Sequence, residues 1–85
     1  MHSITVNVGS AVGLHARPAA IISEAAGTLD SSVLLGIPGG NAVDASSSLL
    51  IMTLGAGKGA AVEVSGDDQA AVEKIAGLVA QDLDA

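Results

Sequence analysis

The chain contains no phenylalanine, tyrosine or tryptophan among its 85 residues. A core without aromatic rings has to be filled by aliphatic side chains, methionine and alanine, so helices and sheet must approach closely to pack. Hydrophobic residues make up 49% of the sequence, which makes such a core feasible. At this length, folding buries roughly 60 to 65% of the surface that the unfolded chain exposes. We therefore expect one domain spanning residues 1–85.

Acidic residues outnumber basic residues by nine to three, which gives a net charge of −6 at neutral pH. This is the opposite of the basic surface that nucleic-acid binding requires, so we expect no nucleic-acid partner. The absence of cysteine excludes a disulfide framework and thiolate metal ligands. The longest aliphatic run, Leu49 to Met52, is far too short to cross a bilayer, and the N-terminus lacks the pattern of a signal peptide. We expect a cytoplasmic protein without membrane insertion.

Alternation of polar and apolar residues predicts half-buried strands in three segments. The clearest is residues 3–8, and residues 33–37 and 60–65 alternate in the same way. The turn residues Pro38, Gly39 and Gly40 follow the second of these segments. A short run over residues 41–44 comes after the turn and completes a predicted hairpin.

Three other segments have the features of helices. Residues 16–27 carry apolar residues at helical spacing and end at a glycine, and residues 46–54 begin with hydroxyl residues suited to capping and stop before Gly55. A third helix is expected after the capping candidates Asp67 and Asp68. Its apolar stripe consists of Val72, Ile75, Val79 and Leu83.

The predicted element order is β-α-β-β-α-β-α, which indicates an α+β fold. Four strands with one apolar face can be covered by helices on that side while the other side faces solvent. This arrangement is open to antiparallel sheets and seldom to parallel ones. Periodicity alone does not give the order of the strands in the sheet.

The segment from Gly13 to Ala20 places His15 at the mouth of the first predicted helix. Pro18 lies within the first turn, where its missing N–H costs least. If His15 caps the helix, the N–H groups of Ala16 and Arg17 point outward, and the positive end of the helix dipole favours an anion there. An imidazole nitrogen can act as a nucleophile, and the guanidinium of Arg17 can stabilise the oxygens of a phosphoryl group. The segment is therefore chemically suited to hold a phosphoryl group on His15.

On spacing alone, the better interpretation of an isolated His-x-Arg is that His15 is a plain helix cap and Arg17 a solvated side chain. The residues from Gly13 to Ala20 match the active-site signature of the HPr family of histidine-containing phosphocarriers, and the resemblance covers essentially the whole chain, including Met52 to Gly55. It implies an open-faced β-sandwich in which a four-stranded antiparallel sheet carries three helices on one face. It also implies a reversible phosphohistidine on Nδ1 of His15 and the role of a carrier, not an enzyme.

The resemblance implies partners as well. The donor would be enzyme I, charged by phosphoenolpyruvate, and the acceptors would be enzyme IIA domains of sugar permeases. We expect a monomer with no cofactor and no metal. Two related readings stay open: a carrier in a nitrogen-related or other specialised phosphotransfer chain, and a regulatory binding module of the same fold. A hydrolase with His15 as base would need a nearby nucleophile or carboxylate, and only Ser10 in residues 9–20 offers one.

Docking residues follow from the same resemblance, because the family's partner surface surrounds the active histidine and the second helix. The positions in this chain are Arg17, Ala20, Ser48, Leu49 and Met52. Leu49 and Met52 are three residues apart and can form an exposed apolar patch, although one or both can instead face the core.

Many members of the family carry a regulatory serine at the start of the second helix, where an ATP-dependent kinase phosphorylates it. Counting back from Leu54 and Gly55 selects Ser47. Ser46 and Ser48 replace the basic and aliphatic neighbours that relatives with this switch commonly have. We interpret Ser47 as a helix cap first and as a candidate phosphosite second.

Overall fold

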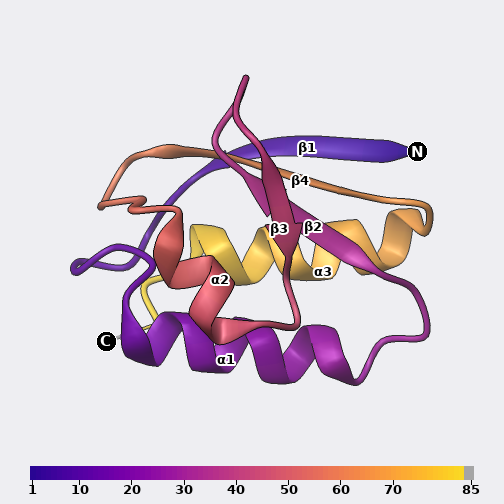
Figure 1. Cartoon of the computed structure of the whole chain (residues 1–85), viewed down its shortest axis with the longest axis horizontal. Helices are drawn as coiled ribbons and strands as arrows, with labels where there is room; N and C mark the ends of the chain where they lie inside the picture. The colour runs from indigo at the N-terminus through magenta and orange to yellow at the C-terminus, as the bar shows by residue number, and fades with distance from the viewer. Residues whose placement is uncertain (84–85) are drawn as a thin grey trace.

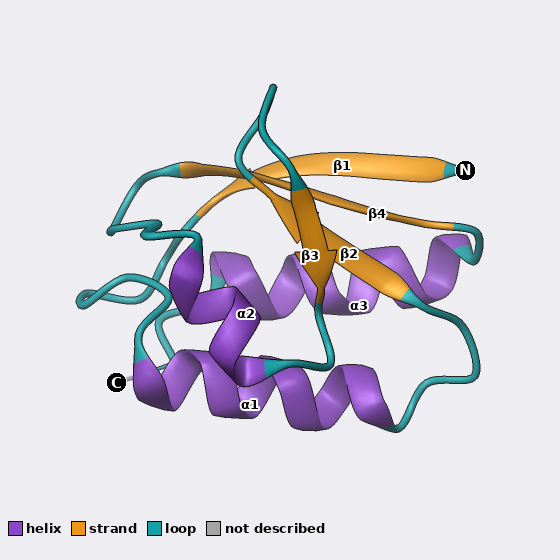
Figure 2. Ribbon diagram, in the orientation of Figure 1, coloured by secondary structure: helices purple, strands orange, loops and turns teal. Residues whose placement is uncertain are grey.

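A single antiparallel sheet with strand order β1-β4-β2-β3 forms one layer of the computed structural model, which describes residues 1–83. The elements are β1 (His2–Asn7), α1 (Ala16–Gly27), β2 (Val33–Gly36), β3 (Ala42–Asp44), α2 (Ser48–Thr53), β4 (Ala61–Gly66) and α3 (Gln69–Ala80). All three helices lie on one side of the sheet (Figures 1 and 2). The predicted open-faced β-sandwich and its element order are confirmed.

Strand β4 lies between β1 and β2 and pairs with both. Val64 is opposite Ile4 in β1 and opposite Leu35 in β2, so apolar side chains from three strands meet on the face that the helices cover. Thr5 and Glu63 are paired on the other face and are exposed. The alternation seen in the sequence thus corresponds to a core side and a solvent side of the sheet.

The core is formed by aliphatic side chains from both layers. Its largest fully buried members include Ile22, Leu35, Ile51 and Ile75. Helix α3 also buries Ala71 and Ala76, whose small side chains permit close approach to neighbouring elements. No helix within residues 1–83 is long and apolar enough to cross a membrane.

The bounds of α2 and α3 differ from the predicted ones. Helix α2 begins at Ser48, because Ser46 lies in the preceding turn, where its backbone N–H donates to Asp44 Oδ1 at 2.9 Å. Helix α3 ends at Ala80, because Gln81 has extended backbone angles, with φ −82° and ψ 154°. Leu83 therefore lies outside the helix whose apolar stripe it was expected to extend, yet it is still half-buried against the core.

Candidate functional site

His15 is the N-cap of α1, as the sequence predicts, and its side chain is exposed. Its backbone is extended, and its carbonyl accepts the Ala19 N–H at 2.9 Å, which starts the helix. The imidazole forms no capping hydrogen bond. Pro18 has no N–H, and within residues 1–83 the N–H groups of Ala16 and Arg17 have no protein acceptor. The ring and two outward backbone donors therefore stand together at the positive end of α1.

The loop before His15 is held against the connection between α2 and β4. The Leu14 N–H donates to the Ala56 carbonyl at 2.8 Å, and the Leu14 side chain is buried. Gly13 has a φ of +77°, and a Cβ at this position would overlap the Ala56 carbonyl oxygen. Only glycine fits both the backbone conformation and the close approach. This contact fixes the position of His15 and of the start of α1.

A shallow hollow of about 200 Å³ adjoins the ring. It is lined by Val12, Leu14, His15, Met52, Gly55, Ala56 and Gly57. Apart from His15, its lining residues are aliphatic residues, Met52 and glycines. Val12 was not among the residues predicted from the sequence, and neither was the segment 55–57, because only the tertiary contact between Leu14 and Ala56 brings them to His15. The one sequence signal for this wall is an apolar residue, Val12, in a predicted loop, and in the structure Val12 is 60% exposed.

The predicted docking residues occupy different environments. Arg17, Ala20 and Leu49 are exposed, Ser48 is half-buried, and Met52 is half-buried against the core. Leu49 is 69% exposed. Leu50, which was not predicted, is 41% exposed. Helices α1 and α2 lie against each other (Figure 1), and Met52 lines the hollow beside His15.

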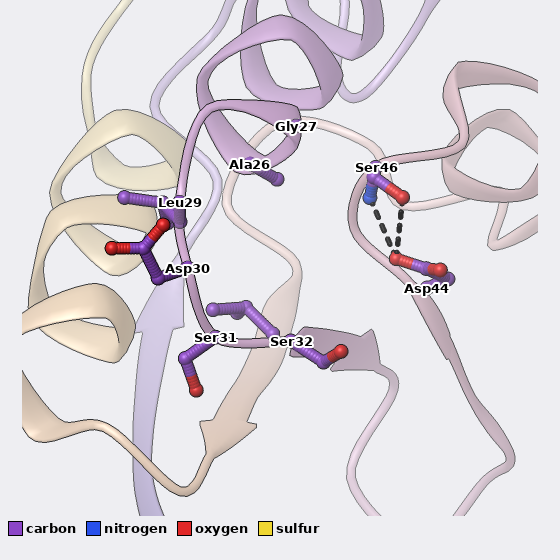
Figure 3. Close-up of a pocket in the computed structure, with 9 residues that line it drawn as sticks. Ala26, Gly27, Leu29, Asp30, Ser31, Ser32, Asp44 and Ser46 are labelled. Carbon is purple, nitrogen blue, oxygen red and sulfur yellow. Dashed lines mark hydrogen bonds between the residues drawn. The ribbon is translucent and has the colours of Figure 1, made fainter.

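A second hollow lies at the other end of α1, away from His15 (Figure 3). Its lining includes Asp44 and Ser46. The backbone N–H and the hydroxyl of Ser46 both donate to Asp44 Oδ1, at 2.9 and 2.8 Å. These two hydrogen bonds stabilise the carboxylate and lower the pKa of Asp44, and the backbone N–H of Ser46 has the larger effect. Residues 1–83 contain no group of three or more histidine, cysteine, aspartate or glutamate side chains that could hold a metal ion. Asp44 and Ser46 of this hollow are thus partners in a local turn.

Ser47 is the N-cap of α2, as predicted, and its Oγ accepts the Leu50 N–H at 3.2 Å. We expect Ser47→Ala to lower the free energy of unfolding by about 1 kcal/mol, because this N–H loses its acceptor. Ser47→Asp should keep the stability, since a carboxylate also caps and suits the helix dipole. Its added charge beside Leu49 and Leu50 should slow phosphoryl transfer, whereas Ser47→Ala should not. Thermal unfolding and transfer assays measure both effects; equal behaviour of the two variants would remove Ser47 from the cap and from the docking surface.

The fold has close counterparts among solved structures. The crystal structure of a phosphocarrier protein HPr from Bacillus anthracis matches with a TM-score of 0.84 and 28% identity, over 92% of this chain and 95% of that one. An HPr structure from Thermoanaerobacter tengcongensis matches with a TM-score of 0.83 and 29% identity, over 93% of this chain and 91% of that one. Together with the exposed histidine at the start of α1, the fold defines the chain as a small phosphocarrier domain.

The family is shown by sequence. Residues 2–81 match the family described as the PTS HPr component phosphorylation site. A phosphocarrier protein HPr from Streptomyces coelicolor is 42% identical over 82 residues, which cover 93% of this chain and 88% of the relative. A phosphocarrier protein NPr from Klebsiella oxytoca is 32% identical over 76 residues, covering 89% and 84%. The chain belongs to the HPr family of phosphotransferase-system phosphocarriers.

Proposed function

We propose that this chain is a cytoplasmic phosphocarrier that accepts a phosphoryl group on Nδ1 of His15 from phospho-enzyme I and passes it to enzyme IIA domains of sugar permeases. It acts as one domain, residues 1–85, and as a monomer, and it shuttles phosphate without transforming a small molecule. The observation that carries the proposal is the position of His15, an exposed N-cap whose ring makes no capping bond and stands beside two free backbone N–H groups.

The transfer step needs little more than these groups. The neutral ring nitrogen attacks phosphorus while the bond from phosphorus to the donor breaks, and the donor keeps the bonding electron pair. Negative charge on the three phosphoryl oxygens is met by the N–H groups of Ala16 and Arg17, by the helix dipole and by the Arg17 guanidinium. The same groups hold the phosphohistidine. A nucleophile of the acceptor then attacks phosphorus, the bond from phosphorus to Nδ1 breaks, and the His15 ring keeps the electron pair.

Docking is proposed around the site. The predicted residues Arg17, Ala20, Ser48, Leu49 and Met52 border the start of α1 and the exposed side of α2. Val12 in the loop before His15 and Leu50 in α2 are further exposed apolar residues. A small apolar patch next to a polar site suits partners that bind briefly and must separate after each transfer.

The test is a relay assay with purified components. Phosphoenolpyruvate and an enzyme I from the sugar system should add one acid-labile phosphate per chain, and a sugar-specific enzyme IIA domain should then remove it. Labelling only by the enzyme I of a nitrogen-related system would assign the chain to that pathway. Failure with every enzyme I would contradict a carrier and favour a binding module of the same fold. Sustained turnover of a small molecule by the chain alone would contradict the carrier role.

Arg17→Ala should retain the fold, because the side chain is exposed, and should slow phosphoryl transfer about 100-fold, because one charged donor to the developing oxyanions is lost. Arg17→Lys should recover part of the rate, since the charge returns without the planar fork. Lys74→Ala in α3 is the matched control: it makes the same change in net charge at another exposed position. Rapid-quench measurement of transfer from phospho-enzyme I gives the rates; an unchanged rate in Arg17→Ala would remove Arg17 from the site.

A further inference from the structure

Ser10 is fully buried, although it belongs to the loop that leads to His15. Its Oγ donates to the Gln81 carbonyl at 3.3 Å and accepts the Leu83 N–H at 3.1 Å. Both partners lie in the segment that follows α3, 71 and 73 positions along the chain. The hydroxyl is engaged as donor and as acceptor, so Ser10 is not available as a nucleophile. A buried hydroxyl bonded in this way holds its two partners in place, because breaking either bond leaves a polar group unsatisfied.

The backbone beside Ser10 makes the same contact between loop and segment. The Gly9 N–H donates to the Val79 carbonyl at 3.1 Å. A Cβ at Gly9 would overlap the Ala80 carbonyl oxygen, so the two backbones touch with no room for a side chain. In Figure 1 the loop, the start of α1 and the segment after α3 gather at the same end of the molecule.

The contact reaches His15 through a short and constrained stretch of chain. The Ser10 carbonyl accepts the Gly13 N–H at 3.0 Å, and Gly13 lies two residues before His15. Gly13 is buried, and its positive φ fixes the turn. Because the chain from residue 10 to 14 is tied at both ends, a displacement of Ser10 must be absorbed at Gly13 or passed on to the start of α1.

We propose that Ser10 is a positioning residue for phosphoryl transfer: its hydroxyl joins residues 81–83 to the loop and so holds the His15 ring where transfer requires it. The inference rests on the proposed function of His15 and adds the segment after α3 to the parts of the molecule on which the reaction depends. A reacting group displaced by about 1 Å can lose about 100-fold in rate, so a loosened loop should have a measurable effect on transfer.

The first test removes the hydroxyl. Ser10→Ala should slow transfer from saturating phospho-enzyme I about tenfold or more, well below the unfolding temperature, with the KM for the donor unchanged. Ser65→Ala is the matched control, because Ser65 is the other buried serine within residues 1–83 and lies in β4. Its rate should stay within about twofold of wild type. An unchanged rate in Ser10→Ala, or an equal fall in Ser65→Ala, would overturn the proposal.

The second test removes the Leu83 N–H, which donates to the Ser10 hydroxyl. Leu83→Pro lacks the N–H that Ser10 accepts, whereas Leu83→Ala keeps it and loses only the side chain. Leu83→Pro should be slower than Leu83→Ala. Adding Ser10→Ala to Leu83→Pro should slow transfer by a smaller factor than Ser10→Ala does in wild type, because both changes remove the bond between the Leu83 N–H and Ser10 Oγ and only the bond to the Gln81 carbonyl is left to lose. Fully multiplicative effects would contradict a shared contact.

A third readout does not depend on phosphate. Hydrogen exchange at the Gly13 amide should be faster in Ser10→Ala and unchanged in Ser65→Ala, because only the first change loosens the turn. If wild-type protein accepts no phosphate, the proposed function of His15 fails on its own evidence. The Gly13 amide then still decides whether Ser10 holds the loop, and an unchanged exchange rate would overturn that part too.

Discussion

Replacing His15 by alanine is expected to abolish phosphate acceptance from phospho-enzyme I while leaving the fold intact. The His15 imidazole supplies the nucleophilic nitrogen at the start of α1. The backbone N–H groups of Ala16 and Arg17 are hydrogen-bond donors and cannot take over this role. The His15 side chain is exposed and forms no capping hydrogen bond, so its loss should change the free energy of unfolding by no more than about 0.5 kcal/mol. Incubation with phosphoenolpyruvate and enzyme I, followed by intact-mass measurement, shows the first effect, and thermal unfolding shows the second.

The matched control is His2→Ala. His2 is the other histidine in the sequence, is exposed, and begins β1. In Figure 1 the N-terminal end of β1 lies on the opposite side of the view from the start of α1. His2→Ala should accept phosphate at the wild-type rate. Undiminished labelling of His15→Ala, or loss of labelling in His2→Ala alone, would contradict the assignment.

Gly13→Ala is expected to lower the free energy of unfolding by about 3 kcal/mol or more. Two costs combine at this position. A positive φ of 77° is unfavourable for alanine, and the added Cβ would overlap the Ala56 carbonyl oxygen. Backbone atoms cannot move aside without disturbing the bond between Leu14 and Ala56, so the loop before His15 should shift. Chemical unfolding measures the loss, and transfer from enzyme I should slow even where the variant is folded.

Gly39→Ala separates the two costs. Gly39 has a similar φ of 83°, but no atom lies within 4 Å of its added Cβ. This variant should lose only about 1 kcal/mol, the cost of the left-handed conformation itself. Equal losses in both variants would show that the close approach of residues 13 and 56 contributes nothing.

Much of the fold follows from local patterns. The alternation over residues 3–8 and 60–65 identifies the buried face of β1 and β4, and His15 followed by Pro18 marks the start of α1. These features depend on neighbours in the sequence, so the sequence alone is enough to predict them. The position of β4 between β1 and β2 is different. It depends on which strands pack best against the helices, and periodicity carries no such information.

The candidate site shows the same division. Leu49 and Met52 belong to one aliphatic run, yet Leu49 is exposed and Met52 packs against the core, because the direction of α2 on α1 decides which side chains are covered. The approach of Ala56 to Leu14 and the bonds from Ser10 to residues 81 and 83 join segments distant in sequence. Leu83 fits the helical stripe of α3 by spacing alone, but the Ser10 hydroxyl binds its N–H outside the helix.

The most direct test of the phosphocarrier account is nitrogen and phosphorus NMR of the chain, with isotope-labelled histidine, after incubation with phosphoenolpyruvate and enzyme I. We predict one phosphoryl group, bonded to Nδ1 of His15, with the His2 ring signals unchanged, and loss of the phosphorus signal when an enzyme IIA domain is added. A phosphoryl group on His2, on a serine hydroxyl or on no residue at all would contradict it.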